Sequence, residues 1–297
     1  MNERSDLHFH PDTCQIAVIG AGTMGAGIAD VFVRAGYTTY LCDASEAAVN
    51  HAMEAWTARL KKDTERGKIT SETVAEWEAR LLTCTPDTLP QVQLYIEAIV
   101  ERPDAKQQLF DRLEELAGGN AILATNTSSL PVTALARTLR HPERLVGMHF
   151  FNPALLMPLV EVISGEATHP DVAQSIFKLA QHIGKRPVMV RDEPGFLVNR
   201  VARPYYTESL LVVEEQTASL EQVDRLLESR GFRMGPFRLM DLIGVDVNFS
   251  VTSSLHERFY GEPRFRPSRL QARKVAAGQH GRKTGLGFYR YDPPSAP

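Results

Sequence analysis

The stretch CQIAVIGAGTMGAGIADVFVRAGYTTYLCD, residues 14–43, decides the fold of the N-terminal half of the chain. Residues 14–20 form a short apolar run that ends in glycine, which is typical of a buried parallel strand. Residues 22–35 follow with apolar side chains at helical spacing. Residues 38–41 predict a second strand, and Asp43 stands just after it. The pattern predicts a βαβ unit of about thirty residues.

Three glycines of this unit, Gly20, Gly22 and Gly25, form a G-x-G-x-x-G motif between the strand and the helix. Gly20 permits a tight turn, Gly22 lets the backbone approach a pyrophosphate, and Gly25 lets helix and strand pack closely. Asp43 lies 18 residues after Gly25. A carboxylate there accepts hydrogen bonds from a ribose 2′-hydroxyl and would repel a 2′-phosphate. The motif therefore predicts an NAD site; FAD, or a turn without a ligand, are the alternatives.

Alternating strands and helices continue to about residue 191. Further strands are expected at 94–100, 121–125, 145–150, 159–163 and 187–191, and helices at 104–117, 131–138 and 170–183. Two charged helical stretches, roughly 45–66 and 71–82, interrupt this alternation and indicate a helical hairpin inserted at about 45–85. Strands that alternate with helices of this length predict an α/β fold with a mainly parallel, doubly wound Rossmann-type sheet.

Strand signals stop after about Asp192. A long helix is expected after Pro194, and residues 219–222 form a capping-box pattern that opens the next helix, which Gly231 closes. Further helical stretches follow. The sequence therefore predicts two domains: residues 1–192, a Rossmann domain that binds NAD, and residues 193–297, an all-α C-terminal domain.

Composition and charge exclude several classes of protein. The 297 residues carry a formal net charge of −3, which gives no reason to expect nucleic acid or an anionic membrane as a partner. The three cysteines, Cys14, Cys42 and Cys84, show no C-x-x-C spacing, so neither a disulfide framework nor a metal site is predicted. The N-terminal residues lack the apolar region of a signal peptide, and no apolar run reaches the length of a membrane helix. A cytoplasmic location is expected.

Eight segments together carry a resemblance to a known family. They are VIGAGTMGAGIA (18–29), EAIVE (97–101), TNTSSL (125–130), GMHFFNP (147–153), LVEVI (159–163), PGFLVNR (194–200), MGPFRLMDLIG (234–244) and KTGLGFY (283–289). In this order they resemble the 3-hydroxyacyl-CoA dehydrogenases over nearly the whole chain. The resemblance implies NAD-dependent oxidation of an (S)-3-hydroxyacyl-CoA to the 3-ketoacyl-CoA, and the reverse, in fatty-acid β-oxidation or phenylacetate-type catabolism. Residues 200–210 and 241–252 look most like bacterial enzymes that act on 3-hydroxyadipyl-CoA or 3-hydroxybutyryl-CoA.

The family works with a His–Glu pair, a Ser and an Asn, and these roles fall on His149, Glu161, Ser128 and Asn199. Histidine suits the removal of the alcohol proton because its unperturbed pKa lies near 6.5. A carboxylate on the other ring nitrogen fixes the tautomer and stabilises the imidazolium. Ser128 and Asn199 would orient the substrate. Without the resemblance, His149 fits a packed core residue, Ser128 a helix cap and Asn199 a surface amide, whereas an acid alone in an apolar run needs a partner.

The resemblance also implies binding residues. For the cofactor they are Gly20, Ala21, Gly22, Thr23, Met24, Gly25, Asp43, Glu101, Lys106, Asn126, Ser128 and Lys283. Glu101, Lys106 and Lys283 are equally consistent with surface charges or structural ion pairs. Arg59 and Arg66 of the insertion fall where the family places CoA contacts, although a charged helix face is usually only solvated. Pro158 stands where the family often has a basic residue, so the substrate end of the site is expected to differ.

Two other functions remain open. One is a related dehydrogenase of a free hydroxy acid, such as L-gulonate or carnitine; the other is a non-catalytic NAD-binding protein similar to lens crystallins. The resemblance further implies a homodimer through the C-terminal helical domain, although its apolar residues, such as Tyr206, Leu210 and Leu211, fit the core of that domain equally well. Arg203 is expected on a helix surface rather than against an ω-carboxylate of the substrate.

Overall fold

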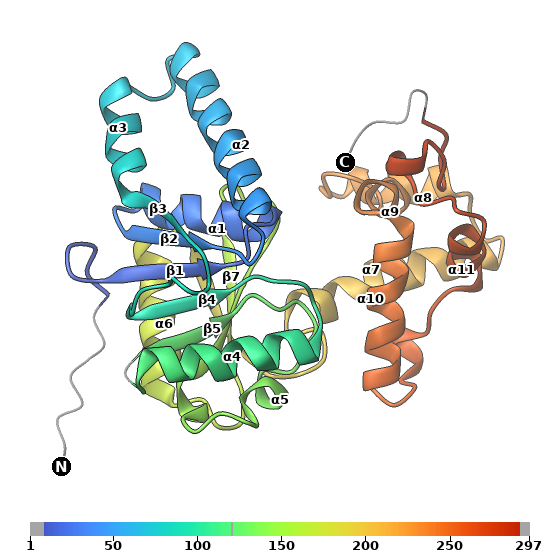
Figure 1. The fold of residues 1–297 in the computed structure, drawn as a ribbon. Coiled ribbons are helices and arrows are strands. Elements are labelled where there is room, and N and C mark those ends of the chain that lie inside the picture. Colours follow the sequence, from blue (N-terminus) through green and yellow to red (C-terminus); the bar gives the residue numbers. More distant parts are fainter. Residues whose placement is uncertain (1–8, 120, 292–297) are drawn as a thin grey trace. The chain divides into compact units, whose positions relative to one another are not determined.

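The computed structural model describes residues 9–119 and 121–291 (Figure 1). The chain forms two compact units, and the division between them falls between Glu193 and Pro194. The first unit is built on one sheet covered by helices, and the described part of the second is helical. This confirms the predicted fold class.

The sheet of the first unit has eight strands in the order β3-β2-β1-β4-β5-β6-β7-β8. The strands are β1 (Gln15–Ile19), β2 (Thr38–Cys42), β3 (Leu81–Cys84), β4 (Leu94–Glu97), β5 (Ile122–Thr125), β6 (Leu145–Phe150), β7 (Leu159–Ser164) and β8 (Arg186–Arg191). All neighbours are parallel except β6 and β7. The strand order reverses between β1 and β4, and ligands of doubly wound sheets bind outside the strand ends at such a switch point.

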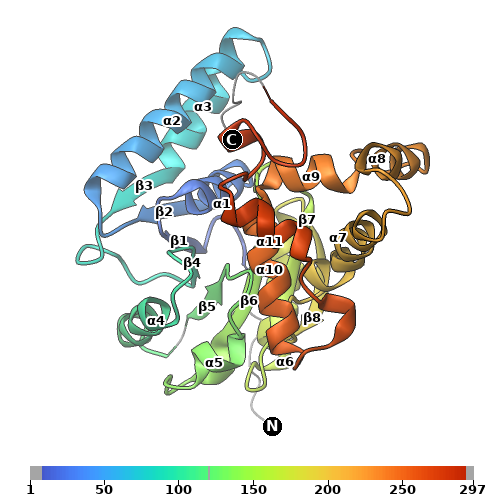
Figure 2. The same cartoon turned by 90° about the vertical axis from the view of Figure 1, so that its right-hand side faces the viewer.

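Helices cover both faces of this sheet. They are α1 (Thr23–Arg34), α2 (Glu46–Glu65), α3 (Ser71–Arg80), α4 (Pro103–Ala117), α5 (Val132–Ala136), the 3₁₀ turn η1 (Pro142–Arg144) and α6 (Pro170–His182). Helices α4 and α6 lie on opposite faces, and α2 and α3 form an antiparallel hairpin that projects from the sheet (Figures 1 and 2). The expected helix over 71–82 is wrong at its end, because Leu81 pairs with Thr39 and starts an edge strand beside β2.

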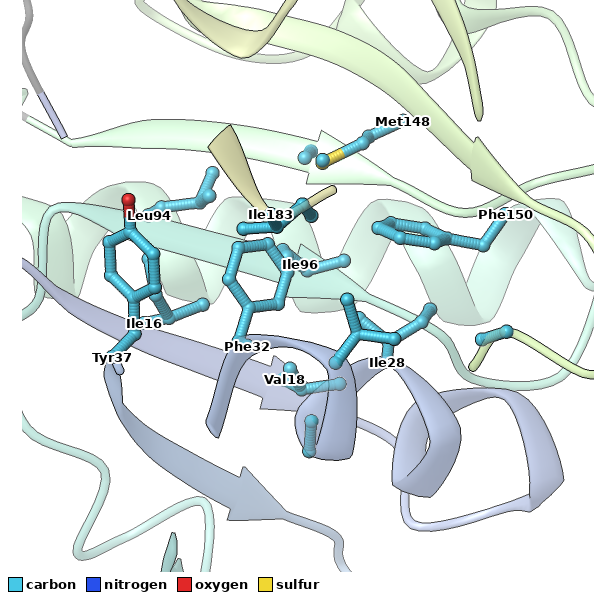
Figure 3. Packing of buried hydrophobic residues seen from close by; sticks show 14 of the residues in the cluster. Ile16, Val18, Ile28, Phe32, Tyr37, Leu94, Ile96, Met148, Phe150 and Ile183 are labelled. Carbon is cyan, nitrogen blue, oxygen red and sulfur yellow. The ribbon is translucent and has the colours of Figure 1, made fainter. Parts of the chain in front are cut away.

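The apolar face of α1 fixes the position of the glycine turn. Ile28 and Phe32 are fully buried and face the side chains of β1, β4 and β6 (Figure 3). The rings of Phe32 and Phe150 meet edge to face, with centroids 6.4 Å apart. Full burial of one such side chain stabilises the fold by about 1.5–3 kcal/mol. The start of α1 is therefore held rigidly over the carboxyl end of β1.

One buried carboxylate attaches the helical hairpin to α1. Asp30 is 0% exposed and accepts hydrogen bonds from the indole Nε1 of Trp56 at 2.7 Å and from Arg59 Nη2 at 2.8 Å, both on α2. Its Oδ1 also accepts a hydrogen bond from Arg34 Nε at 3.0 Å. A buried carboxylate requires such partners. The carboxylate of Asp30 thus joins the middle of α2 to α1.

The second unit packs five α-helices and two 3₁₀ turns among its described residues. They are α7 (Val198–Glu214), α8 (Leu220–Ser229), α9 (Pro236–Ile243), α10 (Val245–Arg258), η2 (Pro263–Phe265), α11 (Arg269–Ala276) and η3 (Arg282–Thr284). The predicted capping box of Ser219 and Gln222 opens α8. Asp241 is 1% exposed and accepts the backbone N–H groups of Phe288 and Tyr289, both at 2.9 Å, which ties the end of the described chain to α9. No described helix is long and apolar enough to cross a bilayer.

Replacing Asp30 with alanine should loosen the hairpin. The Trp56 N–H would remain buried without its acceptor, which typically costs about 1–3 kcal/mol. Both tryptophans of the chain, Trp56 and Trp77, lie in the hairpin, so urea unfolding followed by tryptophan fluorescence should show a lower midpoint. Glu54→Ala, at an exposed position of α2, is the control. Equal midpoints for the two variants would refute the anchoring role of Asp30.

Candidate active site

The glycine turn follows β1 and has the geometry that its spacing predicts. Gly20 has a φ of +111°, and a Cβ there would lie 2.4 Å from the carbonyl oxygen of Ala98. A Cβ on Gly25 would lie 1.7 Å from the carbonyl oxygen of Gly20. A Cβ on Gly22, in contrast, would meet no atom within 4 Å, so packing within the chain does not demand glycine there. No side chain caps the N-terminus of α1 at Gly22. These features fit a site for a pyrophosphate.

The carboxylate of Asp43 lies beside this turn. Its Oδ2 accepts the backbone N–H of Ala21 at 2.7 Å, and its Oδ1 accepts that of Ser45 at 2.8 Å. Asp43 and Gly22 both line a cleft of about 690 Å³ that continues between β2 and α4. Two N–H groups therefore fix the carboxylate at the wall of the cleft, and each oxygen keeps acceptor capacity for a hydroxyl.

His149 and Glu161 meet across the antiparallel pair of β6 and β7. The two residues are direct partners in the strand register, and His149 Nδ1 lies 2.7 Å from Glu161 Oε2. His149 is 6% exposed and Glu161 is 1% exposed. Because a carboxylate only accepts hydrogen bonds, Nδ1 carries the proton and Nε2 is the nitrogen with the lone pair. The pair therefore has the arrangement of a base and the group that orients it.

A second pocket, of about 520 Å³, joins the histidine to the glycine turn. Its lining includes Gly22, Glu101, Asn126, Ser128 and His149, so side chains that the sequence analysis selected from four separate segments share one wall. Both pockets are lined by Gly22 and by residues 98–100. A ligand that crosses the glycine turn would extend from one pocket into the other.

Neighbouring contacts orient the wall of this histidine pocket. Asn126 Oδ1 accepts the backbone N–H of Phe150 at 2.8 Å, which joins the end of β5 to β6. The ring of Phe151 lies against the imidazole of His149, with centroids 4.5 Å apart. Ser128 is thus an exposed residue in the lining of a pocket whose histidine is held in place by its neighbours.

Glu101 and Lys106 form an ion pair. A structural ion pair was one of the alternatives to a cofactor contact that the sequence left open for these two residues. Lys106 is 1% exposed, and its Nζ lies 2.6 Å from Glu97 Oε1 and 3.0 Å from Glu101 Oε2. Glu97 was missed by sequence reasoning. It is a lone acid in the apolar run LYIEAIV, which is the same signal that marked Glu161 in LVEVI.

The predicted CoA contacts lie on the hairpin. Arg59 is exposed, although its guanidinium also pairs with Asp30, and Arg66 is exposed at the end of α2. Pro158 is exposed, and its carbonyl oxygen accepts the backbone N–H of Arg186 at 2.7 Å. The structure thus gives Arg59 a structural role, and CoA binding by either arginine stays a prediction.

The remaining predicted residues belong to the second unit. Asn199 is half-buried on α7, and Lys283 pairs with Asp246 at 2.7 Å. The expectation that Arg203 lies on a helix surface is wrong, since it is 4% exposed. Its Nη1 donates to Thr252 Oγ1 at 3.1 Å, and its guanidinium lies 4.7 Å from the ring centroid of Tyr206. These contacts replace water around the charge.

Replacing Asp43 with alanine should weaken NADH binding by roughly 10- to 100-fold, because hydrogen bonds to a charged group contribute about 1.5–3 kcal/mol. Titration of NADH fluorescence against the protein measures this constant. Asp63→Ala, on the outer part of α2, should bind NADH as the wild type does. An unchanged constant for Asp43→Ala would contradict the ribose contact.

Comparisons with known proteins agree with this site. Residues 15–193 match the family model of the 3-hydroxyacyl-CoA dehydrogenase NAD binding domain, and residues 195–291 match that of the C-terminal domain. The 3-hydroxyadipyl-CoA dehydrogenase of Escherichia coli (strain K12) is 47% identical over 92% of this chain, which spans 58% of that protein's length. The 3-hydroxybutyryl-CoA dehydrogenase of Clostridioides difficile is 38% identical, with 94% of this chain and 99% of that protein covered.

Solved structures show the same likeness. A 3-hydroxybutyryl-CoA dehydrogenase from Escherichia coli K12 superposes with a TM-score of 0.92 at 45% identity, covering 96% of this chain and 61% of that one. The (S)-3-hydroxybutyryl-CoA dehydrogenase of Ralstonia eutropha gives 0.90 at 36% identity, covering 94% of this chain and 99% of that one. The predictions of the family, of NAD as cofactor and of an NAD-dependent oxidoreductase are thereby confirmed. The chain belongs to the 3-hydroxyacyl-CoA dehydrogenase family.

Proposed function

We propose that this protein oxidises (S)-3-hydroxyacyl-CoA to 3-ketoacyl-CoA with NAD, and catalyses the reverse reaction, with His149 as the base. The observation that carries the proposal is the buried contact of 2.7 Å between His149 and Glu161 at the wall of the pocket that reaches Gly22. The closely similar relatives are dehydrogenases of 3-hydroxyadipyl-CoA and 3-hydroxybutyryl-CoA by name. A four- or six-carbon acyl group is therefore the proposed substrate.

The proton of the substrate alcohol goes to Nε2 of His149. Glu161 holds the Nδ1 proton, so the ring cannot turn its protonated nitrogen toward the alcohol. As the ring becomes an imidazolium, its positive charge develops beside a carboxylate in a buried site, where that charge is best stabilised. In the reverse direction the same imidazolium returns the proton to the oxygen of the ketone.

Two further side chains are proposed to orient the substrate. Ser128 lines the histidine pocket, and its hydroxyl is proposed to donate a hydrogen bond to an oxygen of the reacting group. Asn199 is assigned the same task from the second unit through the family resemblance. Each would hold the reacting carbon in one orientation, which lowers the entropic part of the barrier.

The first unit has residues that fit NAD. The open space at Gly22 and the uncapped start of α1 suit its pyrophosphate, and the carboxylate of Asp43 suits its adenosine ribose. Asn126 and Ser128 line the pocket where its nicotinamide would lie, and Lys283 is proposed as a further contact. When bound, NAD supplies the acceptor for the hydride that leaves C3 of the substrate.

The proposal extends to the CoA moiety and to the assembly. Arg59 and Arg66 on the hairpin are proposed to meet the CoA phosphates, since both residues are exposed. The second unit carries exposed apolar side chains on α9 and α10, among them Leu242 at 47% and Val247 at 46% exposure. We assign these side chains to a homodimer interface, because apolar surface of this kind gathers at contacts between subunits. A cytoplasmic location is proposed as well.

His149→Ala should lower turnover by about 10²–10⁴-fold, the usual contribution of a positioned acid–base group. The assay follows NADH absorbance with acetoacetyl-CoA as substrate, and NADH binding should stay close to that of the wild type. The control is His141→Ala, which changes an exposed histidine just before η1 and should keep full activity. A fully active His149→Ala variant would refute the base assignment.

The wild type should reduce acetoacetyl-CoA with NADH and, with NAD in place of NADH, should leave L-gulonate and carnitine unoxidised. The length and the phosphates of CoA distinguish these substrates, because the short free acids lack the phosphate groups that Arg59 and Arg66 are proposed to meet. Turnover of a free acid alone would favour the related hydroxy-acid dehydrogenases, and NADH binding without any turnover would favour a non-catalytic NAD-binding protein.

Val247→Glu should shift the protein from dimer to monomer in sedimentation velocity, since it places a charge in the proposed apolar interface. Leu226→Glu is the control, because Leu226 lies on α8 and is 58% exposed. If both variants sediment as the wild type does, the interface lies elsewhere.

A further inference from the structure

A guanidinium group of the second unit is buried without an acidic partner among the described residues. Arg203, on α7, is 4% exposed, and every hydrogen bond that it makes there goes to a neutral oxygen. Its Nε donates to the carbonyl oxygen of Asn199 at 3.2 Å. Its Nη1 donates to the carbonyl oxygen of Asn248 at 3.3 Å and to Thr252 Oγ1 at 3.1 Å. Buried charges in proteins are normally paired, so this positive charge calls for an anion.

Two N–H groups of this guanidinium have no acceptor among the described residues. An arginine side chain carries five N–H groups, one on Nε and two on each Nη. The hydrogen bonds of Arg203 use Nε and Nη1. Nη2 is not one of the described side-chain atoms that are enclosed without a partner. A ligand can therefore reach Nη2 and accept hydrogen bonds from it.

Lys185, a second cation that is buried without a described carboxylate, shows the contrast. It is 9% exposed, and its Nζ donates to the carbonyl oxygens of Ala154 at 2.6 Å, Leu155 at 3.5 Å and Met157 at 3.0 Å. Three carbonyl oxygens match the three N–H groups of an ammonium. Lys185 therefore holds a loop and has no donor to spare, whereas Arg203 keeps donors for a ligand.

The surroundings of Arg203 stabilise its charge without neutralising it. The guanidinium carbon lies 4.7 Å from the ring centroid of Tyr206, a contact that attracts the cation to a ring without net charge. Burial lowers the pKa of Arg203, and Tyr206 acts to raise it. An arginine nevertheless stays charged in proteins. The positive charge is thus permanent, and the missing element is a negative group.

The position of Arg203 on α7 relates this charge to the reacting end of the substrate. Arg203 follows Asn199 by four residues, which is about one helical turn and a rise of about 6 Å. Residues at this spacing lie on the same face of a helix, and long side chains point back toward its N-terminus. The hydrogen bond from Nε to the carbonyl oxygen of Asn199 has this direction. An anion at Nη2 would therefore lie within about one turn of Asn199.

We propose that Arg203 binds the terminal carboxylate of a dicarboxylic acyl group, so that it selects a six-carbon 3-hydroxyacyl-CoA with an acid at C6. This inference rests on the proposed function, because it takes from it the contact of Asn199 with the substrate. Three carbon–carbon bonds separate C3 of such a substrate from its terminal carboxyl carbon, a span of about 4 Å. A carboxylate at C6 therefore reaches the next turn of α7. A 3-hydroxybutyryl group ends one carbon after C3 and does not reach it.

The same charge discriminates against an apolar chain of equal length. The terminal methyl group of a hexanoyl chain would displace water from Nη2 and offer it no acceptor. A donor that is left buried without a partner is costly, and the cost is greater for a charged group. Sites built to bind a polar group reject analogues that lack it for this reason. Arg203 thus favours the diacid both by binding it and by disfavouring the monoacid.

Calorimetry tests this binding without turnover. Adipyl-CoA and hexanoyl-CoA have the same chain length, differ only at C6 and lack the 3-hydroxyl that is oxidised. The wild type should bind adipyl-CoA roughly 10- to 100-fold more tightly in isothermal titration, the usual contribution of hydrogen bonds to a charged group. Equal dissociation constants for the two thioesters would overturn the proposal, and this comparison requires no variant.

Arg203→Leu tests which residue produces the preference. It should lower kcat/KM for 3-hydroxyadipyl-CoA by roughly 10- to 100-fold and leave that for 3-hydroxyhexanoyl-CoA within about threefold, because only the diacid loses a contact. An equal loss on both substrates would indicate a structural role and overturn the proposal. Arg225→Leu is the control, since Arg225 is an exposed arginine of α8 and should keep the wild-type ratio.

Arg203→Lys supplies the test if the leucine variant does not fold. It keeps the positive charge but lacks the planar group that presents Nη2, so the ratio of the two kcat/KM values should fall about fivefold or more. An unchanged ratio would contradict the role of Nη2.

The two hypotheses fail in different ways. A wild type that neither oxidises these thioesters nor reduces acetoacetyl-CoA would refute the proposed function, and calorimetry would still decide whether the chain binds the diacid. A wild type that oxidises both thioesters with equal kcat/KM would refute this inference alone.

Discussion

The hydrogen bond between His149 and Glu161 depends on the one reversal of strand direction in the described sheet. Because β7 runs antiparallel to β6, the two residues stand directly opposite each other, and cross-strand partners have Cβ atoms about 4.5–5.5 Å apart. The apolar residues around them, such as Val160 and Val162, are fully buried. A carboxylate in that setting needs a donor, and an imidazole in that setting needs its tautomer fixed. His149 supplies the donor that the buried carboxylate needs, and Glu161 supplies the acceptor that fixes the tautomer of the imidazole. The same contact therefore satisfies both the packing of the fold and the chemistry of the pair.

The parallel part of the sheet brings the other groups to the same edge. The carboxyl ends of β1, β2, β5 and β6 lead into the glycine turn, Asp43, Asn126 and His149. These ends lie along one edge of the sheet, on either side of the point between β1 and β4 where the strand order reverses. Residues that are more than a hundred positions apart in the sequence therefore line adjoining pockets. The hairpin of α2 and α3 adds exposed basic side chains to the same unit without interrupting the strand order.

Features that depend on local pattern could be predicted from the sequence, and features that depend on distant partners could not. The glycine motif, the capping box of Ser219 and most strands follow from residues within a few positions of each other. The edge strand β3 was missed because the pairing with β2, rather than the propensity of its own four residues, ends α3. Arg203 was misplaced because its partners Thr252 and Asn248 lie on another helix. Glu97, a lone acid in an apolar run, was missed, and its partner Lys106 lies nine residues away on a different element.

Three carboxylates at this edge of the sheet, those of Asp43, Glu101 and Glu161, differ in the donors that surround them. Asp43 accepts backbone N–H groups at the end of β2, Glu101 accepts a loop and an ammonium group, and Glu161 accepts an imidazole. An ionised carboxylate offers about four acceptor sites, so it can fix several donors while one site still faces a ligand. The same group can therefore hold a turn at Asp43, a loop at Glu101 and an imidazole at Glu161. The neighbouring strand ends determine which donors reach each carboxylate. Those donors in turn determine what each carboxylate holds in place.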